Sequence, residues 1–301
     1  MNILIIGKGQ LGLCIQDEIK TYPFKNKQDN YFFYGHNELD ITSEKSIESI
    51  FKKVNPKVVI NCAAYTDVNK AEKEVKKAYE VNSTGVYNLK KASKKHGAYL
   101  IHISTDYVFD GEKGTPYNEE DNVTPLNNYG ITKLSGEIML YEDKDAMIVR
   151  TSWVYSKYGK NFFKTILDKI LAGENLRVVY DQIGTPTYAP GLAHELVRIV
   201  DERLFTSHSG VYHYSDNGCC SWYDFAELIN MFVTKSFPEK VKSTVVITPV
   251  LTEKKKGMPK RPAYSVLDKT KFYNDFYSNG LSEDRHWCNN VLRAVIDYCK
   301  D

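Results

Sequence analysis

The feature that most limits what this chain can fold into is a glycine-rich turn close to its start. The motif Gly7-Lys8-Gly9-Gln10-Leu11-Gly12 follows a short apolar run, Asn2–Ile6, and precedes apolar residues spaced like one helix face. Between a strand and a helix, such glycines allow a tight turn, a close approach to a pyrophosphate and close packing of the helix. We therefore expect Gly7, Gly9 and Gly12 to form a dinucleotide-binding loop, and a plain glycine turn is the alternative.

Apolar runs and helix-like segments alternate along the first half of the chain. Further strands are predicted at Tyr31–Tyr34, Val58–Ile60 and Leu100–Ile103, and the segments between them have helical spacing. This alternation predicts an α/β fold: a Rossmann-like, doubly wound parallel sheet with helices on both faces. We expect residues 1–155 to form a dinucleotide-binding domain and residues 156–301 to form mainly a smaller α/β substrate domain, from which later strands could return to the first sheet.

The charge balance and the cysteines exclude several classes of partner. Lys and Arg number 40 against 38 Asp and Glu, a formal net charge of +2, so neither a nucleic acid nor a membrane is expected as a partner. No apolar run approaches the roughly 20 residues that cross a bilayer. The six cysteines include no C-x-x-C pair, and we expect a cytoplasmic protein with reduced thiols and no metal site.

The sequence leaves the choice between NADH and NADPH open. In a dinucleotide-binding fold, an acidic residue at the end of the second strand binds the adenosine ribose. That strand is expected to end near Gly35 or His36, where no acid occurs, and Glu38 and Asp40 come later. No arginine that would favour a 2′-phosphate lies there either.

A second group of residues has the pattern of an acid catalyst. Tyr129 and Lys133 are four residues apart, which places them on one face of a helix. A tyrosine has a pKa of about 10, and a neighbouring ammonium would lower it toward neutral pH. Thr105 follows the fourth strand, at the carboxyl edge where such sheets bind ligands, and could hydrogen-bond a substrate carbonyl. We predict that these three residues are catalytic; the alternatives are a surface helix face and a turn-forming hydroxyl.

Longer strings extend these motifs along most of the chain. They are Asn61-Cys62-Ala63-Ala64-Tyr65-Thr66, Ser104-Thr105-Asp106-Tyr107-Val108-Phe109-Asp110-Gly111, Arg150-Thr151-Ser152-Trp153-Val154-Tyr155, Asp181-Gln182 and Gly184-Thr185-Pro186-Thr187. Together with the glycine loop and the Tyr129–Lys133 pair, they resemble the extended short-chain dehydrogenases/reductases. More narrowly, the chain resembles the dTDP-4-dehydrorhamnose reductase family.

The resemblance implies reduction of the 4-keto group of dTDP-4-dehydro-β-L-rhamnose, a dTDP-linked 4-keto-6-deoxy sugar, to dTDP-β-L-rhamnose with NADPH or NADH. It implies that Tyr129 donates the proton, that Lys133 holds the nicotinamide ribose and lowers the pKa of Tyr129, and that Thr105 binds the sugar carbonyl. The substrate-binding residues that it implies are Thr105, Asp106, Trp153 and Arg261. The cofactor-binding residues are Gly7, Gly9, Gln10, Leu11, Gly12, Asp40, Ile41, Ala63, Ala64, Tyr65, Thr66, Tyr129 and Lys133.

Arg261 is a candidate for the diphosphate because a guanidinium makes bidentate phosphate contacts, and a surface arginine before a proline is the alternative. The chain departs from the family at two places. Its glycine loop is one residue shorter than the common G-x-x-G-x-x-G, and residues 13–16 offer no acid for the magnesium ion that some members bind between subunits. A homodimer is possible, but we do not expect a metal to bridge it.

Two alternative functions stay open at this point. One is reduction of another nucleotide-linked 4-keto sugar, because the sequence identifies no residues that recognise the base. The other is a non-catalytic, dinucleotide-binding regulator of the methionine adenosyltransferase type, which resembles the same fold. The set of Thr105, Tyr129 and Lys133 favours an enzyme over the regulator.

Overall fold

A six-stranded parallel sheet forms the centre of the larger part of the molecule. The computed structural model describes residues 1–253, 257–277 and 285–300. The sheet has the strand order β10-β5-β4-β3-β1-β2, and every neighbouring pair is parallel. This order confirms the predicted doubly wound α/β fold. Its strands are β1 (Asn2–Ile6), β2 (Asn30–Tyr34), β3 (Val58–Asn61), β4 (Tyr99–Thr105), β5 (Ala146–Thr151) and β10 (Gly210–His213).

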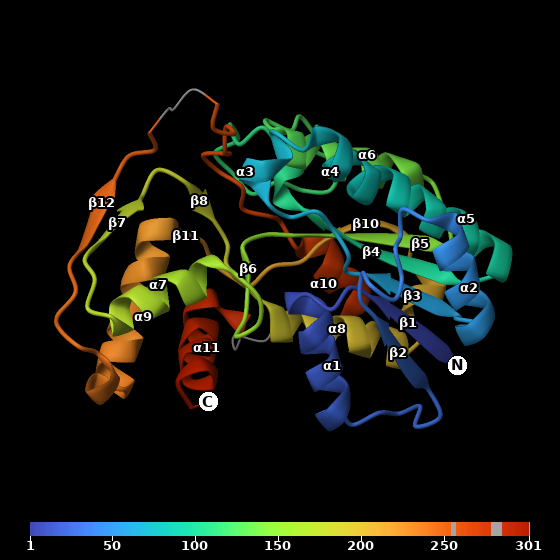
Figure 1. Ribbon diagram of the computed structural model, residues 1–301, viewed down its shortest axis with the longest axis horizontal. Helices are drawn as coiled ribbons and strands as arrows, with labels where there is room; N and C mark the ends of the chain where they lie inside the picture. The colour runs from blue at the N-terminus through green and yellow to red at the C-terminus, as the bar shows by residue number, and fades with distance from the viewer. Residues whose placement is uncertain (254–256, 278–284, 301) are drawn as a thin grey trace.

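Helices cover both faces of this sheet because successive strand side chains point to opposite sides. In β1, Ile3 and Ile5 pack on one side, while Leu4 and Ile6 pack on the other. Figure 1 shows the two helical layers with the sheet between them. The first layer contains α1 (Gln10–Thr21), α8 (Ala189–Asp201) and α10 (Thr270–Phe276); the second contains α2 (Glu44–Val54), α5 (Gly85–His96) and α6 (Asn128–Leu140).

The helical segment expected between β3 and β4 is interrupted in the structure. It consists of α3 (Val68–Ala71), α4 (Val75–Tyr79), a π-helical turn, η1 (Glu80–Thr84), and then α5. Within η1, the Asn82 amide donates to the Tyr65 carbonyl and accepts from the Tyr65 N–H, at 3.0 and 2.8 Å. A π-helical turn inside an α-helix often marks a functional position, and here it holds the segment that follows β3.

A smaller lobe, at the left of Figure 1, has its own hydrophobic core around Phe163, Phe225 and Val291. The two cores are not separated at a single point in the chain, because β10, α8 and α10 pack with the sheet although they follow residue 155. The lobe contains β6 (Val154–Tyr155), α7 (Phe162–Leu171), β7 (Leu176–Val179), β8 (Ile183–Gly184), β9 (Thr187–Tyr188), β11 (Cys220–Ser221), α9 (Trp222–Ser236), β12 (Ile247–Val250) and α11 (Trp287–Lys300).

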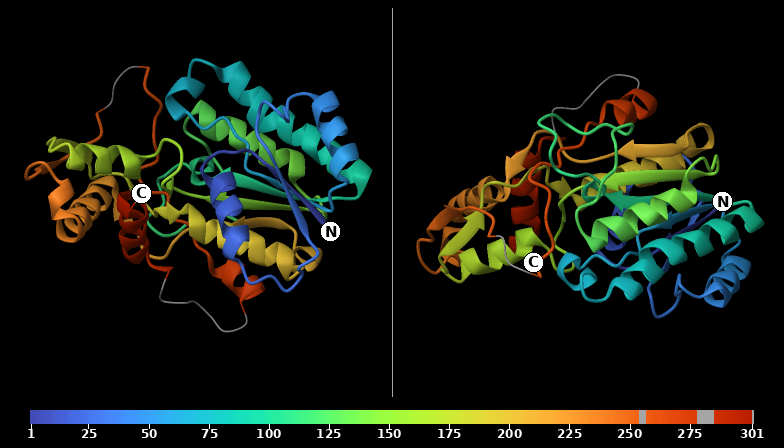
Figure 2. Two further views of the ribbon diagram at one scale, coloured as in Figure 1. Left: turned by 60° about the horizontal axis from the view of Figure 1, so that its bottom comes forward. Right: turned by 90° about the horizontal axis from the view of Figure 1, so that it is seen from above.

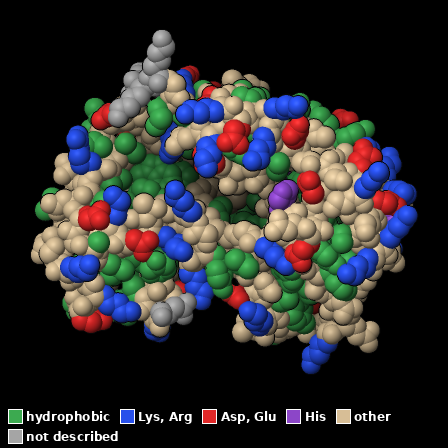
Figure 3. Space-filling view, in the orientation of Figure 1, with side chains coloured by type: hydrophobic (Ala, Val, Ile, Leu, Met, Phe, Trp, Pro, Cys, Tyr) green, Lys and Arg blue, Asp and Glu red, His purple; other side chains and the backbone are tan. Residues whose placement is uncertain are grey.

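The carboxyl ends of the parallel strands point toward the smaller lobe, as the course of β1 from the N-terminus in Figure 1 shows. Both views in Figure 2 show the two parts side by side, joined by several crossings of the chain. In the space-filling view, a hollow with hydrophobic side chains on its floor lies between them (Figure 3). Among the described residues, no helix is both long and apolar enough to cross a membrane.

Candidate active site

The glycine loop has the geometry that a pyrophosphate requires. Gly7 has a φ of +105°, and a Cβ there would lie 2.9 Å from the Ala63 nitrogen. A Cβ on Gly12 would lie 1.9 Å from the Gly7 carbonyl oxygen, so only glycine lets α1 start this close to β1. A Cβ on Gly9, the N-cap of α1, would have no atom within 4 Å. The loop therefore leaves open space in front of a helix N-terminus, and a dinucleotide fits there.

The segment after β3 lies against this loop. The Ala63 N–H donates to Asn61 Oδ1 at 3.1 Å, and Tyr65 is held by Asn82 as described above. Ala64 is half-buried and Thr66 is exposed. Gln10 instead contacts the smaller lobe, where its Oε1 accepts from Asn161 Nδ2 at 2.7 Å.

Two predicted cofactor residues have side chains that point away from a ligand. Leu11 lies in the core between the sheet and α8, so only its backbone can face a phosphate. Ile41 is buried, and a Cβ on Gly85 of α5 would come within 2.8 Å of it. Asp40 accepts from the N–H and the hydroxyl of Thr42 at 2.9 and 2.8 Å, which caps the next turn.

An acid does lie at the end of β2, although the sequence places none there. Glu38 folds back so that its Oε2 accepts from the Gly35 N–H at 2.9 Å and from Lys8 Nζ at 2.6 Å. The hydrogen bond from Lys8 is the main cause that lowers the pKa of Glu38. The side chains of Lys8 and Glu38 are 43% and 48% exposed, so a ligand can reach both.

Tyr129 and Thr105 come together at the carboxyl edge of the sheet. Tyr129 lies in the first turn of α6, which Asn127 caps by accepting the Gly130 N–H at 2.9 Å. Its half-buried ring packs edge-on against Tyr107, with the ring centroids 5.5 Å apart. Thr105 ends β4 and hydrogen-bonds the Tyr129 phenol.

The pKa of Tyr129 differs in direction from the sequence-based expectation. Burial raises it above the ordinary value, and the hydrogen bond with Thr105 offsets only part of that effect. The expected lowering of the Tyr129 pKa by Lys133 is therefore wrong: removal of the phenol from water dominates, and the nearby Asp106 and Tyr107 raise the pKa further. A phenol with a raised pKa keeps its proton at neutral pH, which is the form that donates.

Lys133 is almost completely buried, at 2% exposure. Its Nζ donates to the Ile103 carbonyl at 2.7 Å and lies 3.3 Å from His102 Nε2. Burial lowers the pKa of Lys133 to about 8, and the nearby Glu137 carboxylate opposes that shift. Glu137 in turn forms a buried ion pair with Arg150 of β5, with a shortest distance of 2.7 Å.

Asp106 follows Thr105 and is buried beside it. Its Oδ1 accepts from the Thr105 hydroxyl at 3.1 Å. Burial raises the pKa of Asp106 to about 6, although hydrogen bonds from Ser265 and Thr105 act against it. A carboxylate with this environment gains a favourable interaction from any further hydrogen-bond donor.

The two other predicted substrate residues lie around the same edge. Trp153 follows β5 with a φ of +45° and stacks on Trp222 of α9, with ring centroids 3.5 Å apart and an angle of 6° between the rings. Arg261 is exposed, and its charge acts on Tyr107, which packs on Tyr129. The Lys260 carbonyl accepts from Asn127 Nδ2 at 2.8 Å, which attaches the Arg261 segment to the start of α6.

The sequence matches the family described as "RmlD substrate binding domain" over residues 1–299. A dTDP-4-dehydrorhamnose reductase of Aggregatibacter actinomycetemcomitans is 41% identical over 279 residues, which are 91% of this chain and 93% of that relative. The chain belongs to the dTDP-4-dehydrorhamnose reductase family.

Two further comparisons are with a solved structure and with a relative of another name. A crystal structure of dTDP-4-dehydrorhamnose reductase from Bacillus anthracis, in complex with NADP, is 35% identical, with a TM-score of 0.84 over 98% of this chain and 99% of that one. A relative in Streptomyces niveus, named dTDP-4-keto-6-deoxy-D-glucose reductase, is 33% identical over 259 residues, 85% of each protein. The resemblance seen in the sequence is thereby confirmed.

Several residues that lie at the site were assigned no role from the sequence. Glu38 is brought to β2 by a turn, and Trp222 comes from a helix 69 positions after Trp153 in the chain. Asn61 and His102 occupy paired positions on β3 and β4. A signal was available only for these two, since a polar residue inside an apolar strand requires a buried partner.

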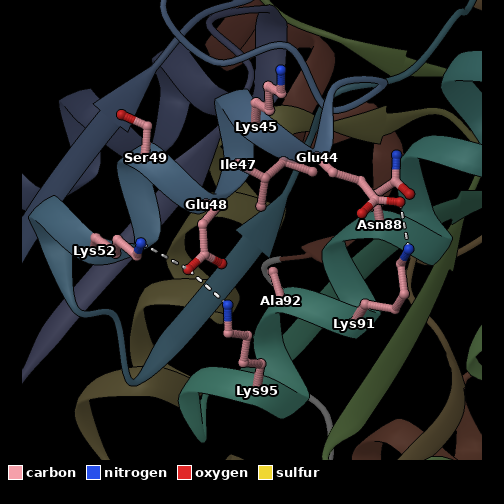
Figure 4. A pocket seen from close by; sticks show the side chains of 10 residues that line it. All are labelled: Glu44, Lys45, Ile47, Glu48, Ser49, Lys52, Asn88, Lys91, Ala92 and Lys95. Carbon is pink, nitrogen blue, oxygen red and sulfur yellow. Dashed lines mark hydrogen bonds and ion pairs between the residues drawn. The ribbon is translucent and has the colours of Figure 1, made fainter.

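A separate groove of about 700 Å³ lies between α2 and α5. Figure 4 shows that Lys95 and Lys91 reach glutamates of the same groove, with Lys95 2.8 Å from Glu48 and Lys91 2.5 Å from Glu44. None of the predicted site residues lines it. Among the described residues, no group of three or more His, Cys, Asp or Glu could hold a metal ion.

Proposed function

We propose that this chain reduces the 4-keto group of dTDP-4-dehydro-β-L-rhamnose, giving dTDP-β-L-rhamnose, with NADPH or NADH. The observation that carries the proposal is the Tyr129 phenol hydrogen-bonded by Thr105 at the sheet edge that also holds the glycine loop. When bound, the reduced nicotinamide supplies the hydride. The chain must then protonate the oxygen that receives the charge and hold the sugar in place.

Tyr129 is the proton donor in this reaction. Its burial keeps the phenol protonated at neutral pH, and the alkoxide that forms on the sugar is a stronger base than a phenolate. Thr105 hydrogen-bonds the carbonyl oxygen, so that both hydroxyl groups face the developing charge. Lys133 lies one turn along α6, and its protonated form stabilises the phenolate after the proton has left.

The remaining contacts select the substrate. Trp153, supported by Trp222, offers an aromatic surface to the sugar, and Asp106 accepts from a sugar hydroxyl. Arg261 is exposed and free to pair with the diphosphate. Gly9, Gln10 and the other loop residues bind the dinucleotide phosphates through the start of α1.

We also propose that the protein works in the cytoplasm, because all six thiols are free and a reducing compartment keeps them so. A homodimer without a bridging metal is part of the same proposal. Ile131 and Ile138, both on α6, are 46% and 62% exposed. Apolar side chains gathered on one helix in this way are typical of protein interfaces.

A second candidate substrate follows from the Streptomyces niveus relative, whose name specifies a different dTDP-4-keto sugar. The two substrates share the nucleotide and the reacting carbonyl, so the same Tyr129 chemistry serves both. Turnover with dTDP-4-dehydro-β-L-rhamnose and with dTDP-4-keto-6-deoxy-D-glucose, compared at equal concentration, separates them. UDP- and CDP-linked 4-keto sugars test whether the base matters.

The deciding experiment compares Tyr129→Phe with Tyr141→Phe. Both remove one phenol oxygen at α6, but Tyr141 follows the far end of the helix and is exposed. Loss of a general acid should lower kcat by roughly 10²–10⁴-fold while dinucleotide affinity stays unchanged, and Tyr141→Phe should retain full activity. Consumption of NADH or NADPH is followed by absorbance. Near-normal turnover of Tyr129→Phe would contradict the proposed role.

A further inference from the structure

Behind the site, three polar side chains form a line inside the apolar sheet. Asn61 Nδ2 lies 3.0 Å from His102 Nδ1, and His102 Nε2 lies 3.3 Å from Lys133 Nζ. Asn61 and His102 have no exposed surface, and Lys133 has 2%. The two strand residues are direct neighbours across β3 and β4. Burying three polar groups costs free energy unless each one has a hydrogen-bond partner, so we asked what this arrangement contributes to the site.

The backbone fixes which way the Asn61 amide points. The Ala63 N–H donates to Asn61 Oδ1 at 3.1 Å, and only the carbonyl oxygen of an amide can accept that bond. The Nδ2 group therefore faces His102 Nδ1 and donates to it. A neutral imidazole has one donor nitrogen and one acceptor nitrogen. With Nδ1 accepting, the ring proton is on Nε2, which faces Lys133.

This tautomer matters for the charge of Lys133. An ammonium group can only donate hydrogen bonds, so it opposes an Nε2–H, whereas an uncharged amine can accept from it. The Ile103 carbonyl accepts an N–H from Lys133 in either state. The ionisable groups that act on Lys133 are Glu137 of α6 and Cys62, which follows β3.

We propose that Asn61 and His102 are positioning residues for the reaction: they hold the Lys133 amine at the end of β4 and, through the tautomer of His102, favour its uncharged form. The inference rests on the proposed function, in which Tyr129 gives up a proton in each turnover. Lys133 returns that proton and is left as an amine, which accepts from His102 Nε2–H. Lys133 then takes a new proton from solvent, so protons balance over the cycle.

The substitution that tests this pair is Asn61→Asp, which is nearly isosteric. A carboxylate accepts from the Ala63 N–H and also from an Nδ1–H of His102, so it moves the ring proton to Nδ1. The Nε2 lone pair then faces Lys133 and favours the ammonium. We expect the pH at which kcat/KM falls on the alkaline side to rise by about one unit, the scale of one hydrogen bond to a charged group.

The new carboxylate also adds a negative charge, and a second background separates the two effects. In His102→Leu protein, Asn61→Asp brings the same charge but has no tautomer to change. If both backgrounds give the same alkaline shift, charge alone explains it and the inference is wrong. The smaller shift expected in the His102→Leu background, with unchanged dinucleotide affinity, supports it.

The tautomer itself is measurable without any activity assay. In ¹⁵N-labelled wild-type protein, the His102 ring nitrogens should show the proton on Nε2, and the Asn61→Asp spectrum should show it on Nδ1; the His102→Leu spectrum assigns the signals. A wild-type proton on Nδ1 would overturn the inference even if Asn61→Asp failed to fold. Full activity of Tyr129→Phe would instead overturn the proposed function while leaving the tautomer result intact.

Discussion

A substitution at Gly136 tests most directly whether the site depends on the close packing of α6 against η1. This glycine lies three residues after Lys133, and a Cβ there would lie 2.1 Å from the backbone oxygen of Asn82. Because the obstacle is backbone in η1, neither a rotamer change nor a flexible side chain can relieve it. Non-bonded atoms approach optimally at about 3.5–4.0 Å, so α6 and η1 must separate by roughly 1.4 Å or more.

The expected cost of Gly136→Ala has two parts. Overpacking of this kind destabilises a fold by about 1–3 kcal/mol, and the backbone obstacle predicts the upper end of that range. The same displacement moves Lys133 and the Asn82 amide that holds Tyr65, and a shift of roughly 1 Å can cost about 100-fold in rate. Urea unfolding and kcat/KM measure the two effects.

Gly114→Ala is the matched control for this experiment. A Cβ on Gly114 would have no atom within 4 Å, and its φ lies outside the left-handed region. Its stability should stay within about 0.5 kcal/mol of the original chain and its kcat/KM should not change. If Gly136→Ala matched Gly114→Ala in both unfolding free energy and kcat/KM, the close packing of α6 on η1 would not support the site, and the reasoning would be refuted.

Two further predictions concern charged pairs. Glu38→Gln removes the negative charge at the end of β2 and leaves Lys8 unpaired, so KM for NADPH should fall several-fold relative to KM for NADH; an unchanged ratio would show that Glu38 does not face the adenosine ribose. Arg150→Met leaves Glu137 buried without its partner and should cost about 3–5 kcal/mol in urea unfolding. Adding Glu137→Leu should restore much of that loss, and no recovery in the double variant would refute the ion-pair argument.

The local motifs of the sequence determined the fold class and the outline of the site. The glycine loop, the alternation of apolar runs with helical spacing and the Tyr129–Lys133 interval depend only on residues close together in the chain, so the sequence alone predicts them. The family resemblance implied that Thr105 and Trp153 bind the substrate. These elements are present in the structure where they were expected.

Only the tertiary structure decided the electrostatics and the long-range contacts. The pKa of Tyr129 rises because the fold buries the phenol, and burial is a property of the whole packing rather than of a four-residue interval. Likewise, a turn brings Glu38 to the end of β2, and Trp222 of α9 stacks on Trp153. His102 of β4 contacts Lys133 of α6, which packs on the sheet. The spacing of apolar residues indicates which side of a helix or strand is buried, but it does not indicate which residues pack against that side.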